Sequence, residues 1–506
     1  MAPLSSPKRE PPQVNPIRYF KKLRLRNVRT FRSDTHLDFC FPNGRLAQWT
    51  VLLGENGTGK TTVLQELAAM QPEQEAATQP PVKSEVGKET EIRPGTLRPV
   101  GANPNWFGWH AHNLPRPWDK PMTMEVALEL TSPHVSIRRA LQRMPDSKLK
   151  DSDKFNQPFE YNYSLSFGDK DGTASITASM RVPMNLEFFN QYFVLGYGAN
   201  RHVAGPSSPY LASEEFGRRL RGSTTNTLFN DEQPLISPEQ WLLGLDHSSK
   251  AGSKSDSAAK HSLQRAIECL KRVLPDVSEI LIKPFAIVPG ATPMTVLFKT
   301  PYGIVPFGGL SLGYKSMAAW LIDFVQRMNI RYGHLPRPES GPAVVLIDEF
   351  DLHMHPKWQM QAMSILGKLF PNTQFIVTAH SPLIVQAAGE NANLALLRKV
   401  KLKNKTYGIV IDNEPVHIRG WRLDQITTSD LYGIKSSRNQ SYQKLFERRA
   451  TLLRKKSLTD KQKTELSKLT QRLDREAPPG TSESGKVAER LFRQLLKAKK
   501  SSHDKA

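Results

Sequence analysis

A glycine-rich stretch with one lysine and two threonines is the first place in the chain where residue types and spacing could do chemistry. Residues 54–61 read GENGTGKT, and glycines at this spacing let backbone N–H groups turn inward around phosphate oxygens. Lys60 can reach the β- and γ-phosphates of a nucleoside triphosphate, and Thr61 can offer its hydroxyl to Mg²⁺. The predicted nucleotide site therefore consists of Gly54, Glu55, Asn56, Gly57, Thr58, Gly59, Lys60, Thr61 and Thr62.

Two adjacent carboxylates follow an apolar run further along the chain. Residues 343–356 read AVVLIDEFDLHMHP, so five strand-forming residues lead directly into Asp348 and Glu349. Open α/β sheets bind ligands at the carboxyl ends of their strands, which is where this pair would lie. We expect Asp348 to hold Mg²⁺, mostly through water. Glu349 is placed to polarise an attacking water as general base.

A histidine ends the next apolar run. Residues 374–385 read QFIVTAHSPLIV, and His380 follows the predicted strand. A lone histidine is more often a structural residue than a catalyst. Its place after a second buried strand, beside the strand of the two carboxylates, predicts that His380 reaches the γ-phosphate.

A fourth segment combines a serine and a glycine at the start of a helix. Residues 310–324 read LSLGYKSMAAWLIDF, in which Ser311 is a good N-cap and Gly313 follows it. A helix N-terminus of this kind can accept a phosphate. On its own the segment is better explained as an ordinary capped helix.

These motifs need strands and helices in a fixed order to position them. The run WTVLL before the glycine loop predicts a buried strand, and helix and strand patterns alternate over residues 310–433, as in an α/β sheet layered with helices. Strand patterns dominate residues 17–63 and 122–182, with a basic edge strand over 18–28, and predict a β-rich N-terminal lobe. The predicted domains are a flexible N-terminus at 1–16, an α/β domain at 17–435 with insertions at about 70–118 and 204–260, and a basic helical region at 436–506.

The charge of the chain favours a polyanionic partner. Its 506 residues carry a net formal charge of +22, and such an excess indicates nucleic acid first, although basic proteins can simply be soluble. Helices are expected at 443–456, 460–475 and 485–500, the second capped by Thr459. These basic helices can grip phosphate backbones, or they can form a solvated face or a protein-docking arm.

The two cysteines, Cys40 and Cys269, are too few for a disulfide framework or a four-sulfur zinc site. No run approaches the roughly 20 apolar residues of a membrane span, and the first residues lack a signal-peptide pattern. We therefore expect a cytoplasmic protein with no membrane partner.

The ordered set GENGTGKTT, LSLGYKS, LIDEFDLHMHP and TAHSP resembles the ABC-type ATPases of the RecF/SMC/OLD-like group, in the AAA_21 branch. The resemblance implies a P-loop NTPase fold of the ABC type, binding and hydrolysis of ATP with Mg²⁺, and two ATP molecules sandwiched in a head-to-tail dimer or a higher homo-oligomer. It implies that Asp351 begins the D-loop and that His380 is the switch histidine. It also implies a signature motif that contacts ATP of the other protomer: Ser311, Leu312, Gly313, Tyr314 and Lys315.

The chain departs from this group's pattern in three respects. Tyr314 and Lys315 replace the acidic ending common in transporters and SMC heads. An insertion of about 250 residues, with no long coiled coil, separates the glycine loop from the signature motif. No glutamine follows the strand that ends near residue 197, so Asn200 or Arg201 is the predicted Q-loop position.

A second resemblance bears on biological role. Residues 420–434, GWRLDQITTSDLYGI, with the leucine- and lysine-rich helical pair that follows, are similar to the ATPase subunits of Septu (PtuA-like) anti-phage systems. This implies the ATPase component of a defence complex that couples hydrolysis to DNA-related work. The chain has neither the cysteine pairs of HNH nucleases nor a Toprim-type acidic cluster after His380, so DNA cleavage is expected from a nuclease partner. The alternatives are a RecF-like DNA repair ATPase and an ATP-switched scaffold that hydrolyses little and regulates a partner toxin or nuclease.

Overall fold

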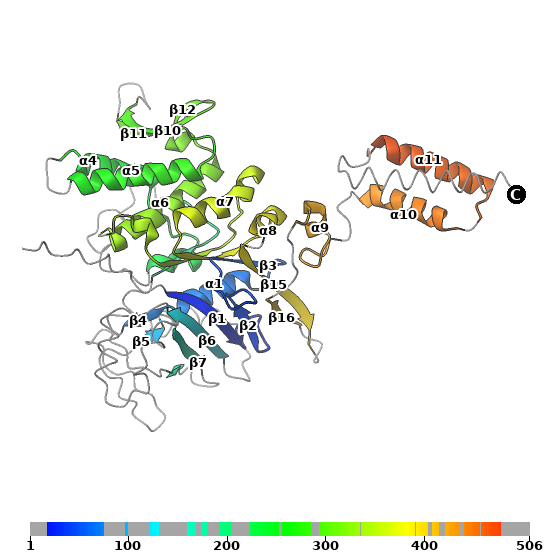
Figure 1. Cartoon of the computed structure of the whole chain (residues 1–506), viewed down its shortest axis with the longest axis horizontal. Coiled ribbons are helices and arrows are strands. Elements are labelled where there is room, and N and C mark those ends of the chain that lie inside the picture. Colours follow the sequence, from blue (N-terminus) through cyan, green and yellow to red (C-terminus); the bar gives the residue numbers. More distant parts are fainter. Residues whose placement is uncertain are drawn as a thin grey trace, which may run out of the picture. The chain divides into compact units, whose positions relative to one another are not determined.

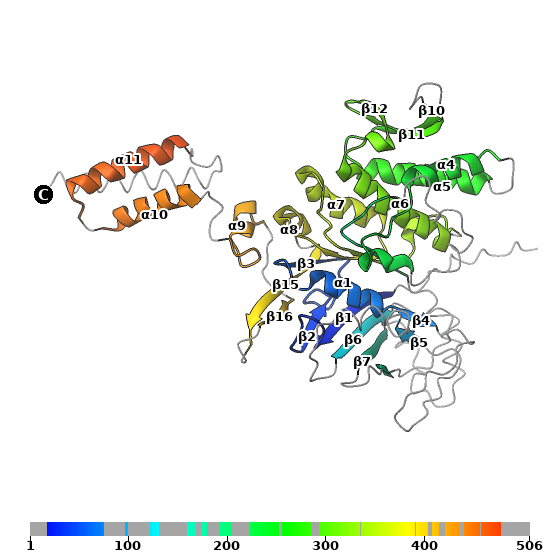
Figure 2. The same cartoon turned by 180° about the vertical axis from the view of Figure 1, so that it is seen from behind.

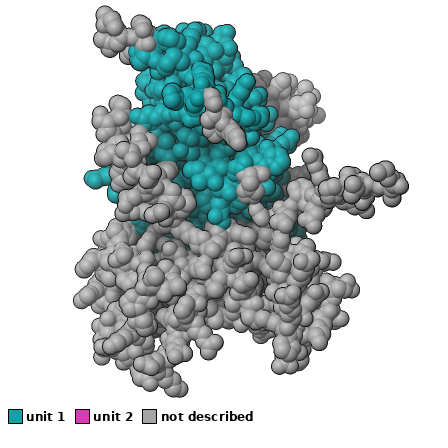
Figure 3. Space-filling model, turned by 90° about the vertical axis from the view of Figure 1, so that its left-hand side faces the viewer, with its two compact units in different colours: residues 1–426 teal, residues 427–506 magenta. Residues whose placement is uncertain are grey.

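The computed structural model describes residues 18–74, 97–99, 122–130, 159–167, 174–179, 193–203, 223–251, 256–285, 293–333, 335–389, 391–402, 407–413, 420–434, 440–455 and 457–476. The chain forms two compact units, residues 1–426 and 427–506, and Figure 3 shows the first of them in teal. Each unit is described by itself. The predicted flexible segment at 1–16 lies outside the described residues.

A six-stranded sheet forms the centre of the first unit (Figure 1). Its order is β16 (Tyr407–Asp412), β15 (Ala392–Lys401), β3 (Trp49–Gly54), β14 (Thr373–Thr378), β13 (Ala343–Ile347) and β9 (Val194–Tyr197). Five strands are parallel and β16 is antiparallel. Every residue of β13 and β14 is buried, as expected for parallel strands covered on both faces.

Helices cover the two faces of this main sheet. On one face α1 (Lys60–Ala69) packs between the main sheet and the N-terminal sheet, and the three share one apolar core. The other face carries α6 (Leu312–Tyr332), α7 (Pro356–Leu369) and α8 (Pro382–Ala388) (Figures 1 and 2). Strand β14 lies between β3 and β13, so the chain segments that follow these three strands meet at one edge.

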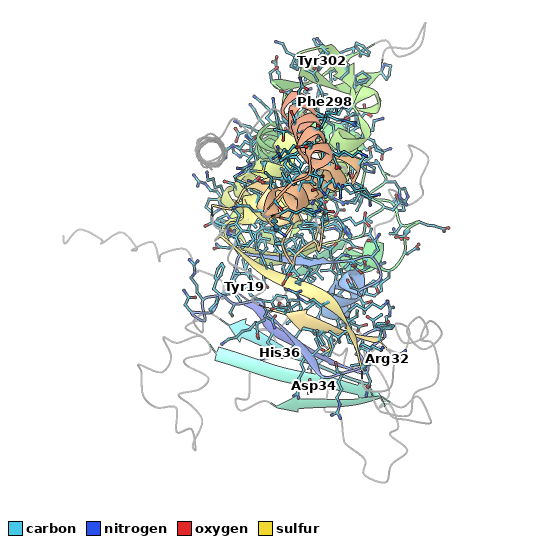
Figure 4. All side chains as sticks on the ribbon, turned by 90° about the vertical axis from the view of Figure 1, so that its right-hand side faces the viewer. Tyr19, Arg32, Asp34, His36, Phe298 and Tyr302 are labelled. Atoms are coloured by element: carbon cyan, nitrogen blue, oxygen red, sulfur yellow. The ribbon has the colours of Figure 1, made fainter. Side chains whose placement is uncertain are left out.

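The N-terminal lobe is an antiparallel sheet in the order β2 (Thr35–Asp38), β1 (Arg18–Arg26), β6 (Met122–Leu130), β7 (Phe159–Phe167) and β8 (Ala174–Ser179). The prediction of a basic edge strand is wrong, because β1 pairs with a strand on each side. Leu23 and Leu25 are buried while Arg24 and Arg26 are exposed. This alternation distinguishes the two faces of a strand and does not reveal its neighbours. Figure 4 shows Arg32, Asp34 and His36 near the β1–β2 end of this sheet.

The region between the glycine loop and the signature motif is only partly a loop. The predicted insertion at 70–118 contains a short hairpin of β4 (Pro72–Gln74) and β5 (Leu97–Pro99) within its described residues. The predicted insertion at 204–260 contains η6 (Ser223–Leu228), α4 (Pro238–Ser248) and the start of α5 (Asp256–Val273) among its described residues. A three-stranded sheet follows, with β10 (Glu279–Pro284), β11 (Met294–Thr300) and β12 (Gly303–Pro306), and then η7 (Phe307–Gly309). Figure 4 labels Phe298, which is buried in β11, and Tyr302, which is exposed at the turn into β12.

The second unit contains a helical hairpin of α10 (Gln440–Arg454) and α11 (Asp460–Glu476), preceded in the chain by α9 (Leu423–Thr427). Thr459 and Gln462 form a reciprocal cap at the start of α11, each accepting the other's backbone N–H with its side chain. Tyr442 donates to the carbonyl of Leu473 across the hairpin. The third predicted helix, at 485–500, lies outside the described residues. Within the described chain, no helix combines the length and apolarity that crossing a membrane requires.

Candidate active site

The glycine loop joins β3 to α1 and holds Lys60 at its centre. The Lys60 side chain is 7% exposed, and its Nζ donates to the carbonyls of Gly54 at 2.8 Å and Glu55 at 3.0 Å. Burial lowers the pKa of Lys60, and the carboxylates that follow β13 act in the opposite direction. The loop tip, from Glu55 to Gly57, is exposed, whereas Thr58 is buried and donates to the Glu55 carbonyl at 2.8 Å. A fixed cation under an exposed loop of N–H groups is suited to binding phosphates.

Two glycines of this loop have no room for a side chain. Gly54 has φ +146°, and a Cβ there would lie 2.7 Å from the Leu397 carbonyl oxygen. Gly59 has φ +90°, and a Cβ there would lie 2.7 Å from the Thr30 hydroxyl. The backbone therefore passes close to β15 and to the turn after β1 while keeping a conformation that favours glycine.

Hydroxyl groups link the glycine loop to the carboxylate strand. Thr61 donates to one carboxylate oxygen of Asp348 at 2.7 Å, and Thr378 donates to the other at 2.6 Å. Thr62, in contrast, is buried in α1 and lies 3.5 Å from a nitrogen of Arg29. A hydroxyl beside a carboxylate offers the hard oxygen ligands that Mg²⁺ prefers, so Thr61 and Asp348 fit this ion.

Glu349 adopts a left-handed backbone conformation, with φ +46°. Its N–H donates to the Thr378 hydroxyl at 2.7 Å, and its carbonyl accepts a hydrogen bond from Arg201. Arg201 also donates to the carbonyl of Asp348 at 3.0 Å. A non-glycine residue in this region costs about 1 kcal/mol. The bonds on both sides hold the residue there and so fix where its carboxylate projects.

The two predicted Q-loop residues lie in different places. Arg201 is buried against the backbone that follows β13, and burial lowers its pKa to about 10, which leaves the guanidinium charged at neutral pH. Asn200 is exposed and donates to the carbonyl of Asp231 at 2.9 Å. Of the pair, Arg201 contacts the carboxylate segment.

A buried network connects β9 to the helix of the signature motif. The Tyr197 hydroxyl donates to Asp323 at 2.9 Å, and Arg327 donates to the same carboxylate oxygen at 2.7 Å. Burial raises the pKa of Tyr197, so the phenol remains a donor. The Tyr197 carbonyl accepts the backbone N–H of Asp348 at 2.8 Å. Through Tyr197, α6 is tied to the strand that positions the carboxylates.

His380 is exposed at the end of β14, and its segment is joined to the D-loop. The backbone N–H of His380 lies 3.2 Å from both carboxylate oxygens of Asp351. Gln359 of α7 accepts from the Ser381 hydroxyl at 2.5 Å and donates to the carbonyls of Asp351 at 3.3 Å and Met354 at 3.0 Å. These bonds hold the two loops as one unit, which we call the D-loop bracket.

The start of α6 packs against the D-loop on one side and is exposed on the other. A Cβ at Gly313 would lie 2.3 Å from the carbonyl oxygen of His353 in the D-loop, so this position needs glycine. Ser311 is exposed and makes no capping hydrogen bond with its side chain. Leu312 is 62% exposed. An uncapped helix N-terminus beside an exposed leucine is suited to contact with an anion and a second surface.

The next two signature residues face the chain itself. The Tyr314 hydroxyl donates to the carbonyl of Pro275 at 2.6 Å, and its ring centroid lies 5.8 Å from that of Trp358. Lys315 is half-buried and donates its backbone N–H to the Ser311 carbonyl. Tyr314 therefore anchors the start of α6, and Ser311 and Leu312 are the residues that it presents.

Thr378 and Gln359 are functional candidates that the sequence analysis missed. Thr378 had a signal, because it is a polar residue directly after the apolar run at 375–377 and two positions before His380. Gln359 had none, because its bracketing role depends on two loops that meet at α7 only in the folded chain.

Family models match the two parts of this site. The AAA_21 family, "AAA domain, putative AbiEii toxin, Type IV TA system", matches residues 228–386, which include Asp348, Glu349 and His380. The AAA_23 family, "AAA domain", matches residues 22–70, which include the glycine loop. The two matches identify AAA-type ATPase domain sequences in the chain. The predicted α/β fold class is confirmed by the mainly parallel sheet, and the family matches support the predicted ATPase activity.

Similar proteins extend the comparison. The ATPase is 24% identical over 483 residues to the "Septu protein PtuA" of Bacillus mycoides (strain KBAB4), covering 92% of this chain and 52% of that protein. It is 46% identical over 76 residues to the "Retron Vc95 probable ATPase" of Vibrio cholerae serotype O1 biovar El Tor, or 15% of each chain. The chain thus spans about half the length of the Septu relative and matches a short part of the retron one.

Among solved structures, the ATPase is similar to an SMC head bound to the C-terminal winged-helix domain of ScpA. The two are 13% identical, with a TM-score of 0.39, and the match covers 78% of this chain and 98% of that one.

Proposed function

We propose that this ATPase works as a head-to-tail dimer, or a larger homo-oligomer, that encloses ATP and Mg²⁺ between protomers. One protomer supplies the glycine loop, Asp348 and Glu349, and its partner supplies the start of α6. The observation that carries this proposal is that the start of α6 is exposed and uncapped. Within the described residues the Ser311 hydroxyl has no partner, and Leu312 is 62% exposed. A second copy of the chain would cover both.

In the proposed reaction, a water attacks the γ-phosphorus as the bond to the β,γ-bridging oxygen breaks, releasing ADP and phosphate. Glu349 accepts the proton of the attacking water. Lys60 neutralises charge on the phosphate oxygens, and His380 contacts the γ-phosphate from the same protomer. Thr61 and Asp348 would hold Mg²⁺, which would supply positive charge to stabilise the developing negative charge of the phosphates. Loss of the γ-phosphate removes the contact with Ser311 and opens the dimer.

The biological role we propose is that of ATPase in an anti-phage defence complex with a nuclease partner and DNA-related work. Similarity to a Septu protein along 92% of the chain and to a retron ATPase at 46% identity supports the defence setting. The net formal charge of +22 supports a nucleic-acid partner.

Mixing two inactive variants tests the shared site. Lys60→Ala disables the loop half and Ser311→Arg disables the signature half, so each variant alone should lose turnover. An equal mixture should regain about a quarter of wild-type turnover, because half of the dimers are mixed and each has one intact site. The measurement is steady-state phosphate release after the two proteins are mixed without nucleotide.

The control replaces Ser311→Arg by the double variant Lys60→Ala with Ser311→Arg, which cannot restore any site. Recovery in the first mixture and none in the control supports the shared site. A first mixture that stays at the background of the control would show that both halves of a site come from one chain.

The DNA part has its own measurement, which is ATP turnover with and without duplex DNA, with Glu349→Gln as the blank. A several-fold rise with DNA is the expected result. If turnover did not change when DNA was added, the proposed DNA-related work would be contradicted, and a protein trigger would be indicated.

A further inference from the structure

A hollow with four cationic side chains lies at the opposite edge of the main sheet from the ATP site. It is bounded by α5, by η8 (Pro338–Ser340) and by the end of α7, and its volume is about 260 Å³. Ser340 and Pro371, which line it, precede β13 and β14, whereas Asp348 and His380 follow those strands. Figures 1 and 2 show α5 beside α6 and α7 on one side of the sheet. We call this site the amino-edge hollow.

The cations of the amino-edge hollow are Arg265, Arg272, Arg337 and Lys368. None of them forms an ion pair within the described part of the chain, and three of them are exposed. Four cations and only two carboxylates line the hollow, so an excess of like charge gathers there and is repulsive. A bound anion would relieve that repulsion.

Arg265 is held in place at the hollow. Its Nη2 donates to Ser262 at 3.3 Å and to Asn329 at 3.2 Å, and its Nε is buried with no acceptor among the described residues. The guanidinium is therefore fixed while part of its donor capacity is unused. Fixed donors lose little entropy when a ligand oxygen arrives.

The other lining residues narrow the class of ligand. Glu268 and Glu339 reduce the formal charge of the hollow to a small positive value, which suits contact with one or two phosphate groups at a time. Burial raises the pKa of Cys269 to about 12, so this lining residue is a neutral thiol and not a thiolate. No aromatic ring is among the described residues that line the hollow, so there is no surface on which a base could stack.

We propose that the amino-edge hollow binds backbone phosphates of a nucleic-acid strand, independently of base sequence. The four unpaired cations supply the contacts that phosphodiesters require, and the missing aromatic platform excludes recognition through a stacked base. This inference deepens the proposed nucleic-acid role. It does not depend on the shared ATP site.

The test is binding of a fluorescein-labelled oligonucleotide, single-stranded or duplex, by the full chain across a salt series. The variant is Arg337→Gln with Lys368→Gln, two exposed side chains outside the ATP site. The matched control is Lys283→Gln with Lys401→Gln, two exposed lysines without ion pairs in the described chain. Both double variants lower the net charge equally, and both should keep wild-type ATP turnover without DNA.

The site variant should bind about tenfold more weakly at moderate salt, and the slope of log K against log salt should fall by about 1.4 on a single strand or about 1.8 on a duplex. The control should change little. Equal losses in both variants, or wild-type binding in the site variant, would overturn the proposal while leaving the nucleic-acid role intact. Failure of the wild-type chain to bind any oligonucleotide would overturn both.

Discussion

At the carboxyl edge of the main sheet, the backbone around Asp348 and Glu349 is held on every side, whereas the start of α6 is open. Thr378 and Arg201 bond the Glu349 peptide from its two ends, and Tyr197 accepts the N–H of Asp348. Ser311 and Leu312 are exposed, and the Ser311 side chain makes no capping bond. We call the first region the closed half and the second the open half.

The difference indicates which parts of the site the chain can organise alone. Electrostatic catalysis requires groups fixed before the reaction starts, and the closed half meets that requirement. The exposed residues of the open half have no neighbours among the described residues to fix them, so only contact with another protein surface could order them. Changes in the closed half should therefore alter chemistry within one protomer, and changes in the open half should act through association.

Glu349→Gln should have the largest effect. The amide keeps the shape of the side chain but cannot accept the proton of water, so turnover should fall by about 10²- to 10⁴-fold. ATP binding should persist, and ATP should shift the protein to a species of twice the mass. Turnover can be followed by phosphate release and mass by light scattering. An unchanged mass with ATP would contradict the link between the closed and open halves.

In the part of the chain that the structure describes, Glu66 of α1 is a buried carboxyl without the hydrogen-bond partners that hold the closed half, and it gives a stability test. This carboxyl is buried, and its Oε2 has no hydrogen-bond partner among the described residues. Burial raises its pKa to about 7 from 4.5, with Arg29 opposing the shift. The folded chain keeps a proton that the unfolded chain loses between these values, so stability falls as pH rises from about 4.5 to about 7.

Glu66→Gln should remove this pH dependence. The variant should gain about 3 kcal/mol in free energy of unfolding at pH 8 and under about 1 kcal/mol at pH 5. Urea unfolding at the two pH values measures both, with the exposed Glu232→Gln as control. Equal gains at both pH values would show that Glu66 is not the titrating group.

Thr378→Val tests the shared hydroxyl between the two carboxylate residues. Valine has the same shape, but it leaves Asp348 without one donor and the N–H of Glu349 without an acceptor. We expect kcat to fall about tenfold and stability to fall by about 1–2 kcal/mol. Thr378→Ser keeps the hydroxyl and should retain most of the turnover. Equal losses in both variants would assign the effect to packing.

The smallest effect is expected at the D-loop bracket. Gln359→Leu removes the bonds to Ser381, Asp351 and Met354, and kcat should fall about three- to tenfold with the KM for ATP unchanged. Gln361→Leu makes the same chemical change at an exposed position of α7 and should be neutral. If Gln359→Leu lowered thermal stability but left kcat normal, the D-loop bracket would have a structural role only.

The glycine loop, the carboxylate strand and the histidine strand could be predicted because each motif is contiguous with the apolar run that positions it. The helix expected at 460–475 coincides with α11 for the same reason, since its Thr459 cap is local in the sequence. The neighbours of β1 could not be predicted, because alternation does not specify pairing. Arg201 was predicted only as one of two Q-loop candidates, and its contacts could not be predicted, because its acceptors are Asp348 and Glu349, nearly 150 residues away. The predicted site residues remain predictions for the experiments above.

The left-handed backbone at Glu349 has a consequence for how the sequence can drift. Glycine would relieve about 1 kcal/mol of strain at this position and would abolish the general base. Stability and hydrolysis thus exert opposing selection on one codon. In a lineage that no longer needed to hydrolyse ATP, Glu349 would be among the first positions to be replaced. The resulting protein would have a higher free energy of unfolding than its active ancestor.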